Sequence, residues 1–233
     1  RLAVDQPLSW LMRQAQAVKK GVASAGGTPR EFCTITVTDG IAMGHDGMRS
    51  SLPSRECIAD SVELTIRGHA YDGLVGLAGC DKSLPGMMMA MVRLNVPSIF
   101  IYGGSILPGS FRGQPVTVQD MFEAVGKHSV GEMSDADLDE IERVACPSAG
   151  ACGAQFTANT MACAFEVMGI TPMGSGMVPA VAGAREQVAR EAGELVMQVL
   201  ADDLRPSQII TRESLENAIA TVCMSGGSTN GVL

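Results

Sequence analysis

The stretch that decides the fold is LVGLAGCDKSLPGMMMAMVRL, residues 74–94. Its first five residues form an apolar run and predict a buried strand. Residues 87–94 are rich in strong helix formers, so a helix is expected there. Between strand and helix stand Cys80, Asp81 and Lys82, in a turn with glycines on both sides. Because glycine has no side chain, the backbone of such a turn can approach a ligand closely.

The polar residues of this turn combine donors that prefer different metals. The soft sulfur of Cys80 suits a thiophilic metal such as iron in a cluster, whereas the hard carboxylate of Asp81 suits Mg²⁺ or Mn²⁺. The simpler alternative is a buried free cysteine beside an Asp–Lys surface pair. For an isolated turn that alternative is preferable, so the metal-site hypothesis depends on what surrounds the turn.

The segments around this turn alternate between helix and strand. Residues 11–23 predict a helix, which two glycines end. Residues 34–38, TITVT, are β-branched and alternate between polar and apolar side chains, so they predict a strand. Residues 55–69 carry apolar side chains near helical spacing, and residues 98–102 form another apolar strand. The expected fold is an α/β domain with a mainly parallel sheet flanked by helices.

Unusual polar residues stand where these strands end. Asp39 follows the first strand, the Cys80 turn follows the second, and Gly103-Gly104-Ser105 follows the third. In open α/β sheets, ligands bind in the crevice outside the carboxyl ends of the strands. We therefore expect the three segments to share one crevice. Backbone N–H groups around Ser105 could hold a carboxylate or phosphate, although a plain tight turn explains this loop equally well.

The second half of the chain predicts mostly helices. The apolar spacing and the capping residues place them at residues 117–130, 134–144, 154–168, 178–203 and 212–223. Neither an internal repeat nor a low-complexity linker interrupts the sequence. We therefore assign residues 1–233 to one domain with a helix-rich second half.

The composition narrows the class of protein. The chain has 233 residues, of which 46% are hydrophobic and 18% are charged, as in a well-buried globular domain. A net charge of −8 argues against nucleic acid as a partner. We find neither an apolar run long enough to cross a bilayer nor a signal segment. Arg1 in place of a start methionine suggests a piece of a longer enzyme.

The seven cysteines predict a reducing compartment rather than a disulfide framework. This points to the cytoplasm, or to an organelle matrix in a eukaryote. Cys152 is the best further ligand, because it lies between small residues ahead of a helix whose dipole favours a thiolate. Cys146 is expected to pack, and its spacing from Cys152 is too wide for a zinc pair. Four others are expected in the core, namely Cys33, Cys57, Cys163 and Cys223.

The histidines do not predict a hydrolytic site. None of the three stands in a nucleophile motif with a serine or cysteine. His45 lies in a glycine-rich loop after Asp39 and is the histidine considered for substrate binding. The sequence contains neither a GxGxxG motif nor a P-loop, so nucleotide binding has little support.

Several motifs together resemble the dihydroxy-acid dehydratase and sugar-acid dehydratase family. The similarity runs from about Ala17 to the last residue. Residues 102–109, YGGSILPG, are most similar to the dihydroxy-acid branch, and the 6-phosphogluconate branch matches less well. The other motifs are TDGIAMG (38–44), SLPSRE (51–56), GCDK followed by PG (79–86), and CPSAGACG followed by TANTM (146–161).

The resemblance implies two inorganic cofactors. One is an Fe–S cluster, 2Fe-2S or 4Fe-4S, held by three cysteines with one iron open as a Lewis acid. Cys80 and Cys152 match two of these ligands, and the third belongs to a Pro-Cys-Asn motif that this sequence lacks. The other is Mg²⁺, whose ligands match Asp39, Asp81 and a carbamylated Lys82. Carbamylation makes chemical sense, because it turns a cation beside a metal into an anionic oxygen ligand.

The resemblance also implies the reaction, in which a hydro-lyase removes water from a 2,3-dihydroxy acid, such as 2,3-dihydroxyisovalerate, to give a 2-oxo acid. The open iron, at the cluster that Cys80 helps to hold, would bind the C3 hydroxyl. Mg²⁺, with Lys82 among its ligands, would acidify the C2 proton. The family uses this step in branched-chain amino acid biosynthesis, in isoleucine and valine formation. The intact enzyme would add a C-terminal β-barrel-like domain with the serine base and form a homodimer.

Two alternatives remain open. A sugar-acid or 6-phosphogluconate dehydratase would share these motifs and differ in substrate. A non-catalytic thiol or metal module would use Cys80 and Cys152 as a redox pair, but it leaves Asp39, Asp81 and Lys82 without a role. Because the serine base and a further metal carboxylate lie outside the sequence, we expect the isolated chain to lack dehydratase activity.

Overall fold

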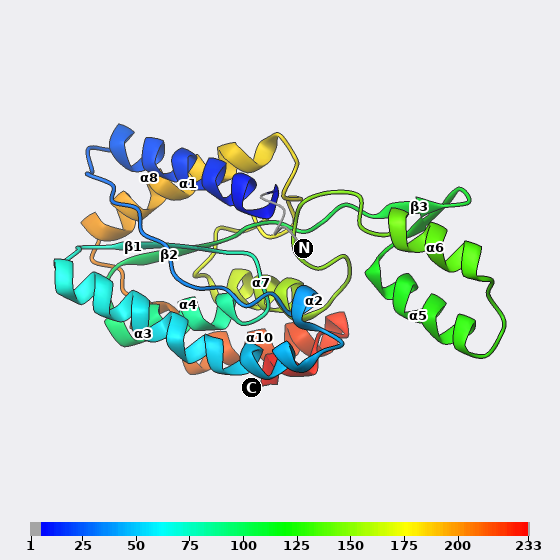
Figure 1. Ribbon diagram of the computed structural model, residues 1–233. Helices are drawn as coiled ribbons and strands as arrows, with labels where there is room; N and C mark the ends of the chain where they lie inside the picture. The colour runs from blue at the N-terminus through cyan, green and yellow to red at the C-terminus, as the bar shows by residue number, and fades with distance from the viewer. Residues whose placement is uncertain (1–5, 233) are drawn as a thin grey trace.

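The computed structural model describes residues 6–232. At its centre β1 (Leu74–Ala78) and β2 (Ser98–Tyr102) pair in parallel along their whole length. One face of this pair is covered by α1 (Gln6–Ser24) and α8 (Ala184–Ala201), and further helices cover the other (Figure 1). The predicted α/β class, with parallel strands flanked by helices, is confirmed.

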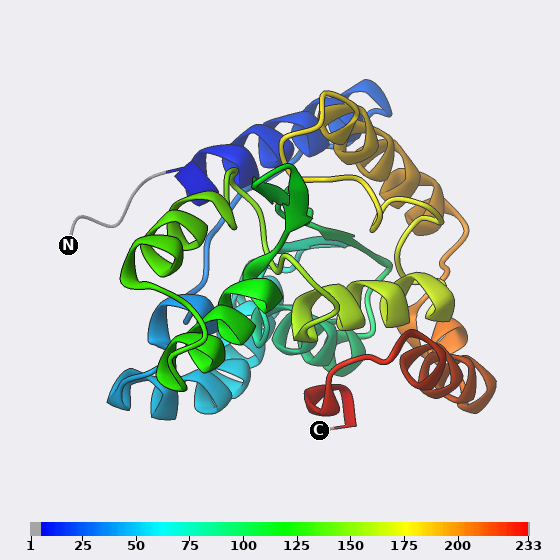
Figure 2. The ribbon, with the colours of Figure 1, turned by 90° about the vertical axis from the view of Figure 1, so that its right-hand side faces the viewer.

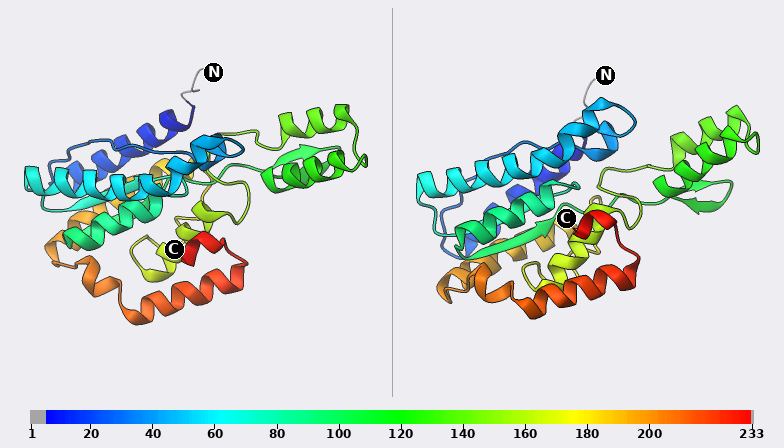
Figure 3. Two further views of the ribbon diagram at one scale, coloured as in Figure 1. Left: turned by 60° about the horizontal axis from the view of Figure 1, so that its bottom comes forward. Right: turned by 90° about the horizontal axis from the view of Figure 1, so that it is seen from below.

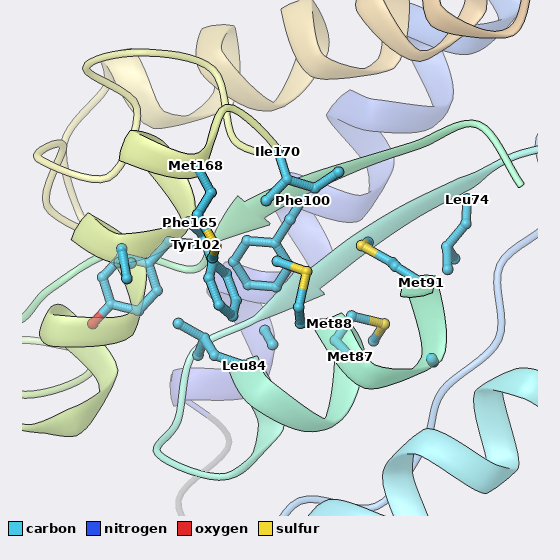
Figure 4. Close-up of a cluster of buried hydrophobic side chains, with 14 of the residues drawn as sticks. Leu74, Leu84, Met87, Met88, Met91, Phe100, Tyr102, Phe165, Met168 and Ile170 are labelled. Atoms are coloured by element: carbon cyan, nitrogen blue, oxygen red, sulfur yellow. The ribbon is translucent and has the colours of Figure 1, made fainter. Parts of the chain in front are cut away.

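All five residues of strand β2 are buried, and because successive side chains point to opposite faces of the sheet they divide between two cores. Phe100 and Tyr102 point into a core formed with α4 (Ser83–Leu94) and α7 (Thr157–Met168) (Figure 4). There the rings of Phe100 and Phe165 meet edge to face, with centroids 5.0 Å apart. Three methionines of α4 fill the remaining space, which suits their flexible side chains (Figure 4).

The opposite face depends on two glycines that let α1 and α8 approach closely. A Cβ atom on Gly21 would lie 2.0 Å from the carbonyl oxygen of Arg190, and one on Gly193 would lie 2.2 Å from that of Val18. A side chain at either position would therefore push the helices apart. The alternate side chains of β2, Ile99 and Ile101, pack under this helix pair.

Residues 109–145 form an arm that projects from the rest of the molecule (Figures 1 and 3). The arm has its own small apolar core, made by Val116, Ala124, Ile141 and Ala145. The predicted helices in this region are confirmed. The elements of the arm are the antiparallel strands β3 (Gly109–Phe111) and β4 (Gln114–Val116) and the helices α5 (Val118–Ser129) and α6 (Asp135–Val144).

The C-terminal part of the chain returns to α7. Helix α10 (Arg212–Ser225) runs beside α7, and the 3-10 helix η2 (Thr229–Val232) contacts α7 again (Figure 2). Within the described residues, each helix is too short or too polar to cross a membrane. The remaining elements are α2 (Asp39–Ala42), η1 (Asp46–Ser50), α3 (Ser51–His69) and α9 (Pro206–Ile209).

The strand predicted at residues 34–38 is wrong, because this segment is irregular. Alternating β-branched residues stabilise a strand when a partner strand lies beside them. Here the segment runs next to α3, where Thr34 and Ser61 join their hydroxyl groups, and Ile35 is 54% exposed. Within residues 6–232 the parallel sheet therefore has two strands. Asp39 enters the site from the first turn of α2 rather than from a strand end.

Several helices begin at other residues than predicted, among them α1 at Gln6 rather than residue 11 and α3 at Ser51 rather than residue 55. Helix α8 begins at Ala184 rather than at residue 178, because turns closed by Pro179 and Ala182 carbonyls occupy the intervening residues. Helix α7 begins at Thr157 rather than at residue 154. Helix α4 begins at Ser83, before Pro85, since the first turn of a helix tolerates a residue without an N–H group.

Candidate functional site

The site is built where the chain leaves β1 and β2. The turn after β1 is rigid, because Ser83 and Leu84 donate their N–H groups to the Cys80 carbonyl and the Cys80 N–H bonds the Ser83 hydroxyl at 3.1 Å. The loop after β2 runs beside it, and the Gly103 N–H bonds the Ala78 carbonyl at 2.8 Å. The same loop pairs at Ser105 with Ala151, the residue before Cys152.

Asp39, Asp81 and Lys82 form one buried group, called here the carboxylate–lysine trio. The Lys82 Nζ donates to the Asp39 Oδ2 at 3.0 Å and to the Asp81 Oδ2 at 3.0 Å. The Ser51 hydroxyl donates to the other oxygen of Asp39. All three members are less than one-tenth exposed. The structure thus brings together the three residues that the sequence predicted as metal ligands, and their role remains a prediction.

The two carboxyl groups of the trio behave differently. Burial alone would raise the pKa of Asp39, but hydrogen bonds with Asp81, Ser51 and Lys82 outweigh burial and lower it. Burial, followed by the hydrogen bond to Asp39, raises the pKa of Asp81 to about 6. Burial opposes the charge of Lys82 too, yet the two carboxyl groups outweigh it and raise the lysine pKa. Without a metal, the ammonium group therefore occupies the position between the carboxylates.

Cys80 and Cys152 form the second part of the site, called here the cysteine pair. Burial raises the pKa of Cys80, against hydrogen bonds from the Asp39 and Asp81 N–H groups. Burial also raises the pKa of Cys152, to about 11. Charge on Cys80 and on Asp81 raises the Cys152 pKa further, so both groups lie within its electrostatic reach.

Cys152 lies close to the expected position at the start of α7, but burial and the helix terminus act on its pKa in opposite directions. Its role as a ligand remains a prediction. The sulfur accepts hydrogen bonds from the N–H groups of Ala158 and Asn159, in the first turn of α7. The helix terminus therefore does favour the anion. Desolvation is the larger effect, because most of the thiol is removed from water, and it keeps the proton on sulfur.

The two weaker candidates for substrate binding, His45 and Ser105, form hydrogen bonds within the protein. The ring of His45 uses both nitrogens within its own loop, since Nε2 bonds the Ile41 carbonyl at 2.9 Å and Nδ1 accepts from the Gly47 N–H at 3.0 Å. The carbonyl of Ser105 accepts from the Ala180 N–H at 2.9 Å. The bonds of His45 lie within its own loop, whereas the bond of Ser105 joins the loop after β2 to the segment before α8. A substrate role for either residue remains a prediction.

The structure overturns most expectations for the other cysteines. Cys33, Cys57 and Cys223 are exposed rather than in the core, and Cys146 is exposed rather than packed. Cys57 and Cys223 lie on α3 and α10 at positions that face outward, so the apolar neighbours in sequence belong to other faces of these helices. Cys163 is half-buried and accepts a weak bond from Gln155 Nε2 at 3.8 Å.

Sequence reasoning missed the polar residues that support the site. Thr157 hydrogen-bonds the Asp81 side chain, and its hydroxyl also meets Ser228 Oγ at 2.8 Å and Asn230 Nδ2 at 3.2 Å. Asn159 donates to the Cys152 carbonyl at 3.0 Å. Thr157 and Asn159 belong to the TANTM motif, so the available signal was a set of polar residues at the start of an otherwise small-residue helix.

A buried polar chain supports the loop after β2 from behind. Gln14 of α1 donates from Nε2 to the Gly103 carbonyl at 2.8 Å and accepts from Arg185 Nε at 3.2 Å. Arg185 is 1% exposed, and desolvation lowers its pKa to about 10. Among the described residues its second terminal nitrogen has no hydrogen-bond partner. The guanidinium thus fixes α1, α8 and the loop after β2 to one another.

The donor set fits the two implied cofactors unequally. Two buried carboxylates converge on one cation, which is the hard oxygen environment that Mg²⁺ prefers. The cysteine pair supplies two thiols, one fewer than the three that the resemblance implies. Within residues 6–232 no cluster of three or more His, Cys, Asp or Glu side chains is arranged to bind a metal. The described residues therefore fit a magnesium site and only part of a cluster site.

Comparison with known proteins agrees with these motifs. The family model for the dihydroxy-acid/6-phosphogluconate dehydratase N-terminal domain matches residues 8–233. Similar proteins include dihydroxy-acid dehydratase 2 of Bradyrhizobium diazoefficiens, 78% identical over 96% of this chain and 39% of the relative. The dihydroxy-acid dehydratases of Parvibaculum lavamentivorans and Pelagibacter ubique are 68% and 66% identical, with the same coverage.

The chain thus spans about 39% of the length of these relatives. The match includes the carboxylate–lysine trio, the cysteine pair and the helix that carries the TANTM motif. The chain belongs to the dihydroxy-acid/6-phosphogluconate dehydratase N-terminal family.

Proposed function

We propose that the full-length enzyme containing this chain dehydrates 2,3-dihydroxy acids to 2-oxo acids in branched-chain amino acid biosynthesis. The observation that carries the proposal is the buried trio of Asp39, Asp81 and Lys82 beside two free thiols. Burying charged groups costs free energy that ion pairing offsets only in part, so such a group more often marks a functional site than a stabilising one. The relatives named as dihydroxy-acid dehydratases support the choice of substrate class.

In this proposal the trio holds Mg²⁺. The Asp39 and Asp81 carboxylates already converge on a cation, so a divalent metal would replace the ammonium charge between them. Neutral Lys82 would add its nitrogen to CO₂, forming an N–C bond and releasing a proton, to give a carbamate. The carbamate removes the positive charge that opposes the metal and offers oxygen ligands in its place.

The cysteine pair would hold part of an Fe–S cluster, with the third thiol supplied from outside the described residues. When bound, such a cluster supplies a Lewis acid that makes the C3 hydroxyl a better leaving group. The buried turn that carries Cys80 and Asp81 would place sulfur and oxygen donors next to each other and shield them from water. We also propose a homodimer and a cytoplasmic location, with a small-molecule substrate and no nucleic acid.

The test is an assay of the full-length enzyme, loaded with metal and cluster, on 2,3-dihydroxyisovalerate and on 6-phosphogluconate. We expect turnover of the dihydroxy acid, lost in Asp81→Asn and kept in Asp60→Asn, whose exposed carboxylate pairs with Arg93 at 2.7 Å. Turnover of 6-phosphogluconate alone would favour the sugar-acid branch. A Cys80–Cys152 disulfide found by thiol titration and mass spectrometry, without Mg²⁺-dependent activity, would favour the non-catalytic module.

A further inference from the structure

Cys152 adopts a backbone conformation that non-glycine residues rarely take. Its φ angle is +34°, in the left-handed region, and Gly150 two residues earlier has a φ of +142°. A side chain in this region strains the backbone, so the surroundings must hold it there. The residue before Cys152 is tied to the loop after β2 by bonds from Ala151 N–H to Gly104 and from Ile106 N–H to Ala151, both 3.0 Å. These bonds use the N–H and carbonyl groups of Ala151, so the Cys152 carbonyl accepts its hydrogen bond from a different residue.

That residue is Asn159, in the first turn of α7. Its Nδ2 donates to the Cys152 carbonyl at 3.0 Å and to the Ala154 carbonyl at 2.7 Å. An amide nitrogen has two hydrogens, so both are used. The side chain of Asn159 thus closes the loop that contains Cys152 over the start of α7.

Tyr102 fixes the orientation of this amide. Its hydroxyl lies 2.7 Å from the Asn159 Oδ1 and donates to it. Flipping the amide would turn the oxygen toward two carbonyl groups, which cannot donate, so the network admits one orientation. Tyr102 is fully buried at the end of β2, and its ring is held in the core (Figure 4).

We infer that Tyr102 and Asn159 are positioning residues that hold Cys152 in its strained conformation, with its sulfur at the N-terminus of α7. A core tyrosine on β2 and a residue of α7 thereby fix the backbone of Cys152 and, through it, the position of the thiol. The inference rests on the proposed function in one respect, namely that Cys152 is a cluster ligand. The arrangement itself is a property of the cluster-free protein.

The test compares alkylation rates of single cysteines in the cluster-free, full-length enzyme, with iodoacetamide as the probe and peptide mass spectrometry as the readout. Tyr102→Phe removes the hydroxyl and keeps the ring. Asn159→Asp replaces the donor nitrogen by an oxygen that repels both carbonyls. The matched control is Thr160→Val, which loses side-chain bonds of the same helix turn to Gln155 and Ser228 instead.

We expect Cys152 alkylation to become about fivefold faster in Tyr102→Phe and faster still in Asn159→Asp, because lost hydrogen bonds let the loop open more often. Cys80 is the internal reference and should keep its rate, as should both cysteines in Thr160→Val. Unchanged Cys152 rates, or equal acceleration of Cys80, would overturn the inference. Circular dichroism checks folding, and if Asn159→Asp does not fold, Tyr102→Phe decides.

A second readout separates this inference from the proposed function. The visible circular dichroism of the reconstituted enzyme reports the surroundings of a cluster, and we expect Tyr102→Phe to change it. A wild-type enzyme that takes up no cluster would refute the proposed function. It would leave the alkylation comparison as a valid test of the positioning residues.

Discussion

The two parts of the site are held in different ways. The carboxylate–lysine trio is held by direct contacts between its own side chains, with Lys82 Nζ 3.0 Å from each carboxylate. In the cysteine pair, Cys152 is held through its backbone by Asn159, which is itself fixed by Tyr102. The trio is therefore assembled largely by its own contacts before any metal binds, whereas the position of the thiol depends on side chains from other elements. Substitutions in the trio should therefore change the charge at the metal site, and substitutions around Cys152 should change the position of its thiol.

The largest effect is expected from Lys82→Arg in the full-length enzyme. Guanidinium keeps its positive charge and cannot be carbamylated under these conditions, so Mg²⁺ binding and turnover should both be lost. Lys82→Ala should also be inactive, and it should lower stability because it leaves two buried carboxyl groups without their cation. Lys19→Arg is the control, because Lys19 forms a surface pair with Glu31 at 2.7 Å. Near wild-type Mg²⁺ affinity in Lys82→Arg would show that the lysine only forms an ion pair.

A smaller effect is expected from Thr157→Val, which tests whether the trio also has outside support. A hydroxyl has one hydrogen and two acceptor positions. The Thr157 hydroxyl donates to Asp81, which lowers the pKa of that carboxyl group, and its oxygen accepts from Asn230 Nδ2 at 3.2 Å. Losing the bond to Asp81 should weaken Mg²⁺ binding by about tenfold. Titration with Mn²⁺ followed by electron paramagnetic resonance measures it.

The control for Thr157→Val is Thr65→Val, which loses a bond to the Ser61 carbonyl within α3. We expect its metal affinity to equal that of the wild type. An equal affinity in Thr157→Val would mean that Asp81 is positioned by Lys82 and Asp39 alone. The trio would then be independent of η2 and of the residues around it.

The smallest effects are expected on the stability of the metal-free chain, and they should have opposite signs. Asp39 has a lowered pKa, so its ionised form stabilises the fold above the unfolded pKa, and Asp39→Asn should lower the melting temperature by about 2–4 °C at pH 7.5. Asp81 has a pKa raised to about 6, so its ionisation costs stability as pH rises through that value. Asp81→Asn should therefore raise the melting temperature by about 2–4 °C.

The gain in Asp81→Asn should shrink as pH falls below about 6 and vanish near pH 4, where Asp81 is protonated in both the folded and the unfolded chain. Differential scanning calorimetry between pH 4 and pH 7.5 follows both variants. If the two substitutions lower the melting temperature equally at every pH, the opposite pKa shifts assigned to Asp39 and Asp81 are wrong.

The difference between the carboxylate–lysine trio and the cysteine pair also explains which features could be predicted from the sequence. The turn at residues 79–86 is local, so its strand, its helix and its polar residues follow from neighbouring amino acids. The parallel pairing of β1 with β2 follows from the helix between them. The contact of Asp39 with Lys82 was expected, but through a strand at residues 34–38 that does not form. Propensity favoured that strand, and the lack of a partner strand decided against it.

The support of the cysteine pair could not be predicted in this way. Asn159 follows Cys152 by seven residues, but Tyr102 comes from β2, so the network appears only when the strand and α7 meet. Burial of Cys152 likewise depends on tertiary packing, and it outweighs the helix dipole that the sequence suggested. Helix dipoles are read from local sequence, whereas desolvation is a property of the folded molecule.

The measurement that tests the account most directly is ¹³C NMR of the full-length enzyme equilibrated with ¹³C-bicarbonate. We expect one carbamate resonance that requires Mg²⁺, because the metal must displace the ammonium that Asp39 and Asp81 hold in its absence. The resonance should disappear in Lys82→Arg and persist in Lys19→Arg. A wild-type enzyme that binds Mg²⁺ equally well with and without CO₂, and shows no such resonance, would contradict the role given to Lys82.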